Sequence, residues 1–153
     1  MNAIELLKSD HQTVAELFED IKANEDGDNR GLFERVKAEL DVHAHIEETI
    51  FYPKLKEQGN EELKDIVLEG IEEHRQIKMF LAEIAALMEG SEKFDPKLKV
   101  LIEDVEHHVK EEEDEMFPLV ESQFDSDFLN ELGAAIAAEK KQFDPKSTAK
   151  SAG

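Results

Sequence analysis

The feature that most constrains the fold is an apolar seam in four stretches of the chain, with residues at alternating steps of three and four. This spacing is that of one face of an α-helix, and helices with such seams pack antiparallel when their connections are short. We therefore predict an all-α protein, an up-down-up-down four-helix bundle with a short fifth C-terminal helix. The four expected seams are Ile4, Leu7, His11, Val14, Phe18, Ile21; Phe33, Val36, Leu40, His43, Glu47, Ile50; Val67, Gly70, His74, Ile77, Leu81, Ile84, Met88; and Leu98, Leu101, Val105, His108, Glu112, Glu115, Leu119.

Turn-forming residues between these stretches divide the chain into three predicted parts. The bundle is expected over residues 1–124, with helices over about 3–24, up to 58, 60–90 and 95–124. The first should begin after Asn2 as N-cap, with Glu5 at the capping-box spacing, and the fourth at Asp95 followed by Pro96. Residues 125–141 are expected to form a short helix packed on or beside the bundle. Residues 142–153 contain few apolar groups and are expected to be a mobile tail.

The amino-acid composition excludes several classes of site and argues against anionic partners. The 153 residues include no cysteine, which excludes disulfides, zinc-thiolate sites and iron-sulfur clusters. The formal net charge of -20 makes nucleic acid or an anionic membrane an improbable partner. No apolar run reaches the roughly 20 residues of a membrane span, and the start of the chain lacks the pattern of an export signal. We therefore expect a cytoplasmic protein, and we leave monomer and weak homodimer open.

Two seams carry the same string, a histidine followed four residues later by glutamate. His43 and Glu47 form the first copy, and His108 and Glu112 the second. Residues at this spacing differ by about 40° around a helix, so both side chains of each pair point into the core. Two buried carboxylates need a positive partner, yet no seam position holds Lys or Arg. A metal ion is the simplest compensator.

Two further seam histidines, His11 and His74, complete a predicted layer of ligands. Counted from the loops at about 1.5 Å per residue, the offsets of these ligands differ by only a few Å, so antiparallel packing brings the ligands of all four helices to one layer. Four imidazoles and two carboxylates suit iron or manganese, and zinc is possible. Six ligands oversupply one ion that keeps an open position, so we expect two ions. Glu47 and Glu112 would each bridge the pair, and an oxo, hydroxo or water bridge and an exogenous ligand would fill remaining positions.

The ordered set of motifs closely resembles the hemerythrin-like, or HHE cation-binding, domain family over about residues 3–124. The resemblance rests on Asp10-His11, the string at 43–53, Glu73-His74 and the string at 108–118. It implies a cofactor of two iron ions with an oxo or hydroxo bridge, with manganese or zinc less favoured. The implied ligands are His11, His43, Glu47, His74, His108 and Glu112.

One departure from the oxygen-carrying members affects the expected function. Those proteins have a further histidine one turn after the third-helix histidine, where this chain has Lys78. The resemblance then favours reaction with peroxide or nitric oxide, or redox sensing, over simple reversible carriage of O2. Glu115 is a candidate for the vacant ligand position, and the other interpretation is that it faces water. Two alternatives remain, a non-catalytic cation-binding or redox-sensing module and a metal-free acidic interaction bundle.

Several neighbours of the ligands receive their own interpretations. We expect Tyr52 to miss the site, because five residues of α-helix place it about 140° from Glu47. Gly70 is interpreted mainly as allowing close helix approach. We expect Glu48 and Glu113 to be mainly solvated, although they could accept hydrogen bonds from ligand imidazoles. His45 and His107 are expected to lie off the seam, and His107 with Glu111 is a weaker alternative ligand pair. Pro53 and Pro118 are expected to kink or stop their helices.

Overall fold

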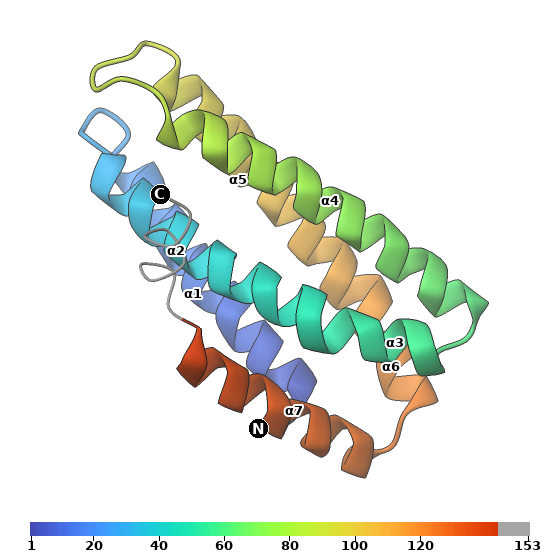
Figure 1. The fold of residues 1–153 in the computed structure, drawn as a ribbon. Helices are drawn as coiled ribbons and strands as arrows, with labels where there is room; N and C mark the ends of the chain where they lie inside the picture. The colour runs from blue at the N-terminus through green and yellow to red at the C-terminus, as the bar shows by residue number, and fades with distance from the viewer. Residues whose placement is uncertain (144–153) are drawn as a thin grey trace.

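The computed structural model describes residues 1–143, and these form the predicted four-helix bundle with a fifth helix (Figure 1). Neighbouring long helices run antiparallel, and two of them continue through a short π-helical segment into a further α-helix. None of the described helices is long and apolar enough to cross a membrane. The elements are α1 (Ala3–Ala23), α2 (Arg30–Ile46), η1 (Glu47–Phe51), α3 (Tyr52–Gln58), α4 (Glu61–Ala85), α5 (Phe94–Glu111), η2 (Glu112–Met116), α6 (Phe117–Gln123) and α7 (Ser126–Gln142).

Side-chain caps fix three of the helix starts. The predicted capping box of α1 is present: the Glu5 N–H donates to Asn2 Oδ1 at 2.9 Å, and the Asn2 N–H donates to Glu5 Oε1 at 3.0 Å. Asn60 caps α4 and Asp125 caps α7 with one bond each, accepted by the side chain from the N–H of Leu63 and of Phe128. The predicted start of the fourth helix at Asp95 is wrong by one residue, since α5 begins at Phe94 without a side-chain cap.

The core consists of two apolar clusters with a polar layer between them. One cluster includes Leu7 and Ile46, and the other includes Val14 and Val36. His11 lies between Leu7 and Val14 along the α1 seam and is itself buried. The bundle therefore has apolar packing on both sides of its histidines, which limits their exposure to solvent.

Helix α7 packs against α1 on the outside of the bundle (Figure 1). Leu129, Leu132 and Ile136 join the first cluster. Gly133 permits the close approach, because a Cβ there would lie 2.7 Å from the carbonyl oxygen of Met1. The predicted mobile tail begins two residues too early, since α7 includes Gln142 and the ring of Phe143 stacks on that of His45; the rest of that prediction lies outside the described residues.

The π-helical segments η1 and η2 begin at Glu47 and Glu112. In each, a backbone N–H bonds five residues back, from Tyr52 to the Glu47 carbonyl and from Phe117 to the Glu112 carbonyl. A wider turn tolerates the proline that follows, because a proline ring clashes with the carbonyl four residues earlier in an α-helix. The alternative of a stop at Pro53 and Pro118 is therefore wrong, because α3 and α6 each run on past the proline.

The extra residue in each wide turn shifts the buried seam by one position. Phe51 and Met116 are buried, whereas the predicted seam residues Ile50 and Glu115 are partly or fully exposed. The third seam ends early for a different reason. Helix α4 stops at Ala85, so Met88 lies in the following loop and is 83% exposed.

Candidate metal centre

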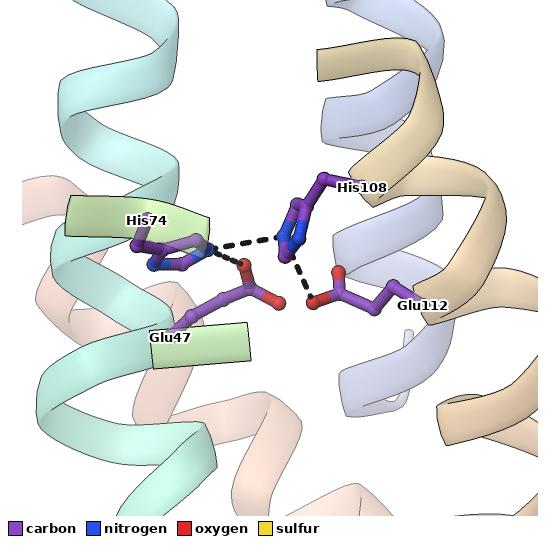
Figure 2. A group of neighbouring side chains, drawn as sticks. All are labelled: Glu47, His74, His108 and Glu112. Carbon is purple, nitrogen blue, oxygen red and sulfur yellow. Dashed lines mark hydrogen bonds and ion pairs between the residues drawn. The ribbon is translucent and has the colours of Figure 1, made fainter. Parts of the chain in front are cut away.

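The six predicted ligand residues meet in one buried layer. Each of α1, α2, α4 and α5 contributes one histidine, and each π-helical segment begins with one of the glutamates. None of the six is more than 6% exposed. Figure 2 shows four of them, with the carboxylates of Glu47 and Glu112 lying below the rings of His74 and His108. The loop counting therefore placed these residues correctly.

The imidazoles form two close pairs. The Nε2 atoms of His11 and His43 are 3.2 Å apart, and those of His74 and His108 are also 3.2 Å apart. Two ligands on adjacent positions of one ion, each at about 2.1 Å, would lie roughly 3.0–3.2 Å apart. The spacing within each pair therefore suits coordination of a single ion, and the layer offers places for two.

The two glutamates lie between the imidazole pairs. Glu47 Oε1 is 3.0 Å from Nε2 of both His43 and His74. Glu112 places Oε1 3.0 Å from His11 Nε2 and Oε2 3.5 Å from His108 Nε2. Glu112 accordingly belongs to two of the three groups of possible ligands among the described residues, one with His11 and His43 and one with Glu47, His74 and His108; the third, Glu73, His107 and Glu111, lies outside the layer.

Three of the four glutamate oxygens are buried without a hydrogen-bond partner. These are both oxygens of Glu47 and Oε1 of Glu112. Glu47 Oε1 and Glu112 Oε1 each lie 3.0 Å from an imidazole Nε2, but these contacts are not hydrogen bonds. An unpartnered buried carboxylate is costly, and a cation in that space would satisfy it. The donor set and its geometry thus fit a metal ion.

A carboxylate holds the outer nitrogen of every ligand histidine. The four contacts join Nδ1 of His11 to Glu113 at 2.6 Å, of His43 to Asp10 at 3.0 Å, of His74 to Glu48 at 3.0 Å, and of His108 to Glu73 at 2.7 Å. With the proton on Nδ1, each Nε2 lone pair points into the layer. Carboxylates in this position orient a metal-binding histidine and strengthen it as a ligand.

These contacts show which functional residues the sequence interpretation missed. Glu48 and Glu113 are not mainly solvated, because each holds a histidine of another helix. Asp10 and Glu73 received no such role, although each directly precedes a ligand histidine. All four stand beside a ligand in the chain and serve a ligand on a neighbouring helix. The signal that could have identified them was an acidic residue next to four of the six predicted ligands, namely His11, Glu47, His74 and Glu112.

The side chain of Lys78 contacts one of these outer carboxylates rather than the residues of the ligand layer. Its Nζ donates to Glu48 Oε1 at 2.6 Å, and its side chain is 47% exposed. Burial acts to raise the pKa of Glu48, but the hydrogen bonds from His74 and Lys78 outweigh it and lower that pKa to about 2. Burial likewise acts to lower the pKa of His74, and Glu47 and Glu48 instead raise it to about 9. A bound cation would displace that proton.

Tyr52 reaches the site, so the prediction that it would miss was wrong. Its hydroxyl donates to Glu112 Oε2 at 2.6 Å and lies 3.4 Å from His74 Nε2. Burial, followed by the nearby charges of Glu112 and Glu47, raises its pKa well above the usual value, so the phenol keeps its proton. Gly70 provides the space, because a Cβ there would lie 3.2 Å from the Tyr52 hydroxyl.

The remaining candidates lie outside the layer. Glu115 is exposed, which agrees with the interpretation that it faces water. His107 bonds to Glu111 at 3.1 Å, but its side chain is 68% exposed. His45 bonds to Glu139 at 2.8 Å on the flank of α7. These residues do not replace any of the six predicted ligands.

A small cavity adjoins the ligand layer on one side. Its volume is about 30 Å³, and all four ligand histidines contribute to its lining. Much of the remaining wall is apolar, including Val14, Ile77, Leu81 and Val105. A cavity of this size admits a water molecule or a similarly small ligand, and excludes larger organic substrates.

Comparison with known proteins identifies a matching family and a structural neighbour. The family model of the hemerythrin HHE cation binding domain matches residues 2–120. A crystal structure of a hemerythrin HHE cation binding domain-containing protein from Mycobacterium kansasii superposes with a TM-score of 0.78 at 28% identity, covering 93% of this chain and 86% of that one.

Two curated relatives are longer than this chain. An uncharacterized hemerythrin-like protein of Schizosaccharomyces pombe is 26% identical over 133 residues, which are 86% of this chain and 66% of that protein. A DNA nickase of Nostoc sp. is 24% identical over 151 residues, which are 95% of this chain and 41% of that protein. The chain therefore spans less than half of the Nostoc relative and about two thirds of the yeast one.

Proposed function

Because the chain belongs to the hemerythrin HHE cation-binding domain family, we propose that it is a non-heme di-iron protein. It binds O2, or reacts with peroxide or nitric oxide, at a carboxylate-bridged two-iron centre. The observation that carries this proposal is the pair of ligand groups joined by Glu112, with buried glutamate oxygens that have no other partner. The histidine-carboxylate donor set suits iron, with manganese or zinc less favoured.

Different residues of the chain would have different roles at such a centre. The four imidazoles would hold the ions through Nε2, together with the carboxylates of Glu47 and Glu112. Iron, when bound, supplies the redox chemistry. The apolar cavity wall limits access to small ligands, and Tyr52 holds a proton 2.6 Å from Glu112 Oε2, next to the layer. The outer carboxylates keep the imidazoles oriented whether or not a small ligand is present.

DNA cleavage, named for the Nostoc relative, is not part of this proposal. That protein is more than twice as long as the segment it shares with this chain. The net charge of -20 also opposes binding to a polyanion. We propose instead a cytoplasmic protein whose ligand is a small molecule.

The metal content per chain tests the central claim. The protein is loaded anaerobically with ferrous iron, desalted, and analysed for iron, manganese and zinc together. About two irons per chain are expected, and zinc alone or no bound metal would contradict the proposal. The adjacent histidines provide a matched pair of variants: His108→Ala should lose iron, whereas His107→Ala, which removes an exposed ring, should keep two ions.

The reactions of the iron-loaded protein then distinguish a carrier or sensor from an enzyme. A carrier or sensor gives a stable and reversible absorption change with O2, whereas an enzyme consumes peroxide or nitric oxide many times per protein. The alternative of a non-catalytic cation-binding module predicts metal-dependent melting without either response.

A further inference from the structure

The last described helix contacts the metal layer from outside the family's matched region, which ends at residue 120. Lys140 of α7 donates to Asp10 Oδ1, and Asp10 Oδ2 accepts a hydrogen bond from His43 Nδ1 at 3.0 Å. A continuous chain of polar contacts thus runs from α7 through α1 to a predicted ligand on α2. The neighbouring contact of Glu139 with His45 fixes the same end of α7 to α2.

Asp10 connects Lys140 of α7 to His43 of α2. Its side chain is only 9% exposed, and its two oxygens have different partners, the ammonium group of Lys140 and the imidazole of His43. The ammonium group therefore fixes the plane of the carboxylate, and that plane sets the direction of the hydrogen bond to the imidazole. Loss of the ammonium group would leave a nearly buried carboxylate free to rotate.

The other half of the same ligand pair lacks this support. Glu113 holds His11, but its side chain is 34% exposed, and within residues 1–143 its one ion-pair partner is that imidazole. In the second pair, Lys78 supports Glu48 from within the bundle itself. Lys140 is thus the contact by which a helix outside the four-helix bundle reaches one ion position and not the other.

We propose that Lys140 is a positioning residue for the ion held by His11 and His43, so that docking of α7 controls retention of that ion. The proposal rests on the two-ion centre proposed above. Lys140 acts through Asp10, which directs Nε2 of His43 into the layer. By linkage, an α7 that is displaced releases one ion more readily, and an ion that is bound favours a docked α7.

Release of iron to a ferrous chelator tests this coupling. Lys140→Met should accelerate release of one of the two ions by about tenfold or more, the range found when partners of ligand histidines are removed. Lys140→Arg should restore slow release, because its guanidinium can still donate to Asp10. Lys141→Met removes the same charge from the adjacent, exposed position and should behave as the unaltered protein. Unchanged or slower release in Lys140→Met, or equal acceleration in Lys141→Met, would overturn the proposal.

A second measurement separates this proposal from the di-iron assignment. Fewer than two ions in the unaltered protein would contradict the proposed function, whereas the position of His43 can still be observed without metal. In the metal-free protein, nitrogen-15 NMR of the imidazoles should show a His43 Nδ1 proton protected from exchange. That protection should fall in Lys140→Met and persist in Lys141→Met; equal protection in both variants would refute a positioning role for Lys140.

Discussion

The two copies of the His-Glu string have the same backbone and different surroundings. In both, an α-helix carries the histidine, the glutamate begins a π-helical segment, and the proline follows in the next α-helix. The copies differ one residue before the proline. Tyr52 of the first copy donates to Glu112, whereas Phe117 of the second stacks on His11, with ring centroids 5.9 Å apart.

The helices that face Tyr52 and Phe117 differ in a corresponding way. Four residues before His74, Gly70 leaves room for the Tyr52 hydroxyl, and four residues before His11, buried Leu7 occupies the corresponding position. Glu112 consequently receives a hydrogen bond that Glu47 lacks, and both oxygens of Glu47 remain without a partner. A repeated motif has therefore produced two buried carboxylates in different surroundings, and the two proposed ion positions should differ in properties.

The largest expected difference between the two copies is in ion content, when the proposed bridging carboxylates Glu47 and Glu112 are each replaced. Glu112→Gln should lose tight binding of both ions, because Glu112 belongs to both ligand groups. Glu47→Gln should retain about one ion, held by His11, His43 and Glu112. Metal analysis after desalting measures the difference. Equal ion content in the two variants would show that the carboxylates are equivalent after all.

An intermediate effect is expected from Tyr52→Phe, which makes the two copies alike at this position. The variant leaves Glu112 Oε2 without its donor, and a hydrogen bond to a charged group contributes about 1.5–3 kcal/mol. The free energy of unfolding of the metal-free protein should fall by about that amount in urea denaturation. A change well below 1 kcal/mol would mean that Glu112 finds another donor.

The smallest expected effect on stability is that of Gly70→Ala, and its sign should depend on the residue at position 52. Gly70→Ala crowds the Tyr52 hydroxyl, which the bond to Glu112 holds in place, so it should destabilise the unaltered protein. In the Tyr52→Phe background the hydroxyl is gone, and alanine should stabilise α4 by about 1 kcal/mol through its helix propensity. Unfolding free energies of the four proteins give the coupling. Additive effects would rule out the proposed contact.

The sequence predicted the bundle and the meeting of the six proposed ligands in one layer, because both follow from helical periodicity and loop length. Tyr52 could not be placed in this way. Its angle was counted at the α-helical 100° per residue, but each residue of the π-helical η1 rotates by less, which brings Tyr52 back toward the side of Glu47. The same wide turn explains why Phe51 replaced Ile50 in the core. Contacts between helices, such as Asp10 with His43, depend on side-chain directions that periodicity does not give.

The contacts of the four outer carboxylates also determine the electrostatic balance of the layer. Six carboxylates touch the ligand imidazoles, namely Asp10, Glu47, Glu48, Glu73, Glu112 and Glu113, and two lysines, Lys78 and Lys140, bond to members of this set. With neutral imidazoles, six negative charges less two positive ones leave four, which two divalent cations would neutralise. Any electron withdrawn from those ions would leave an excess positive charge in a buried layer, where it is costly. We therefore expect oxidation of the centre to be accompanied by loss of a proton or uptake of an anion.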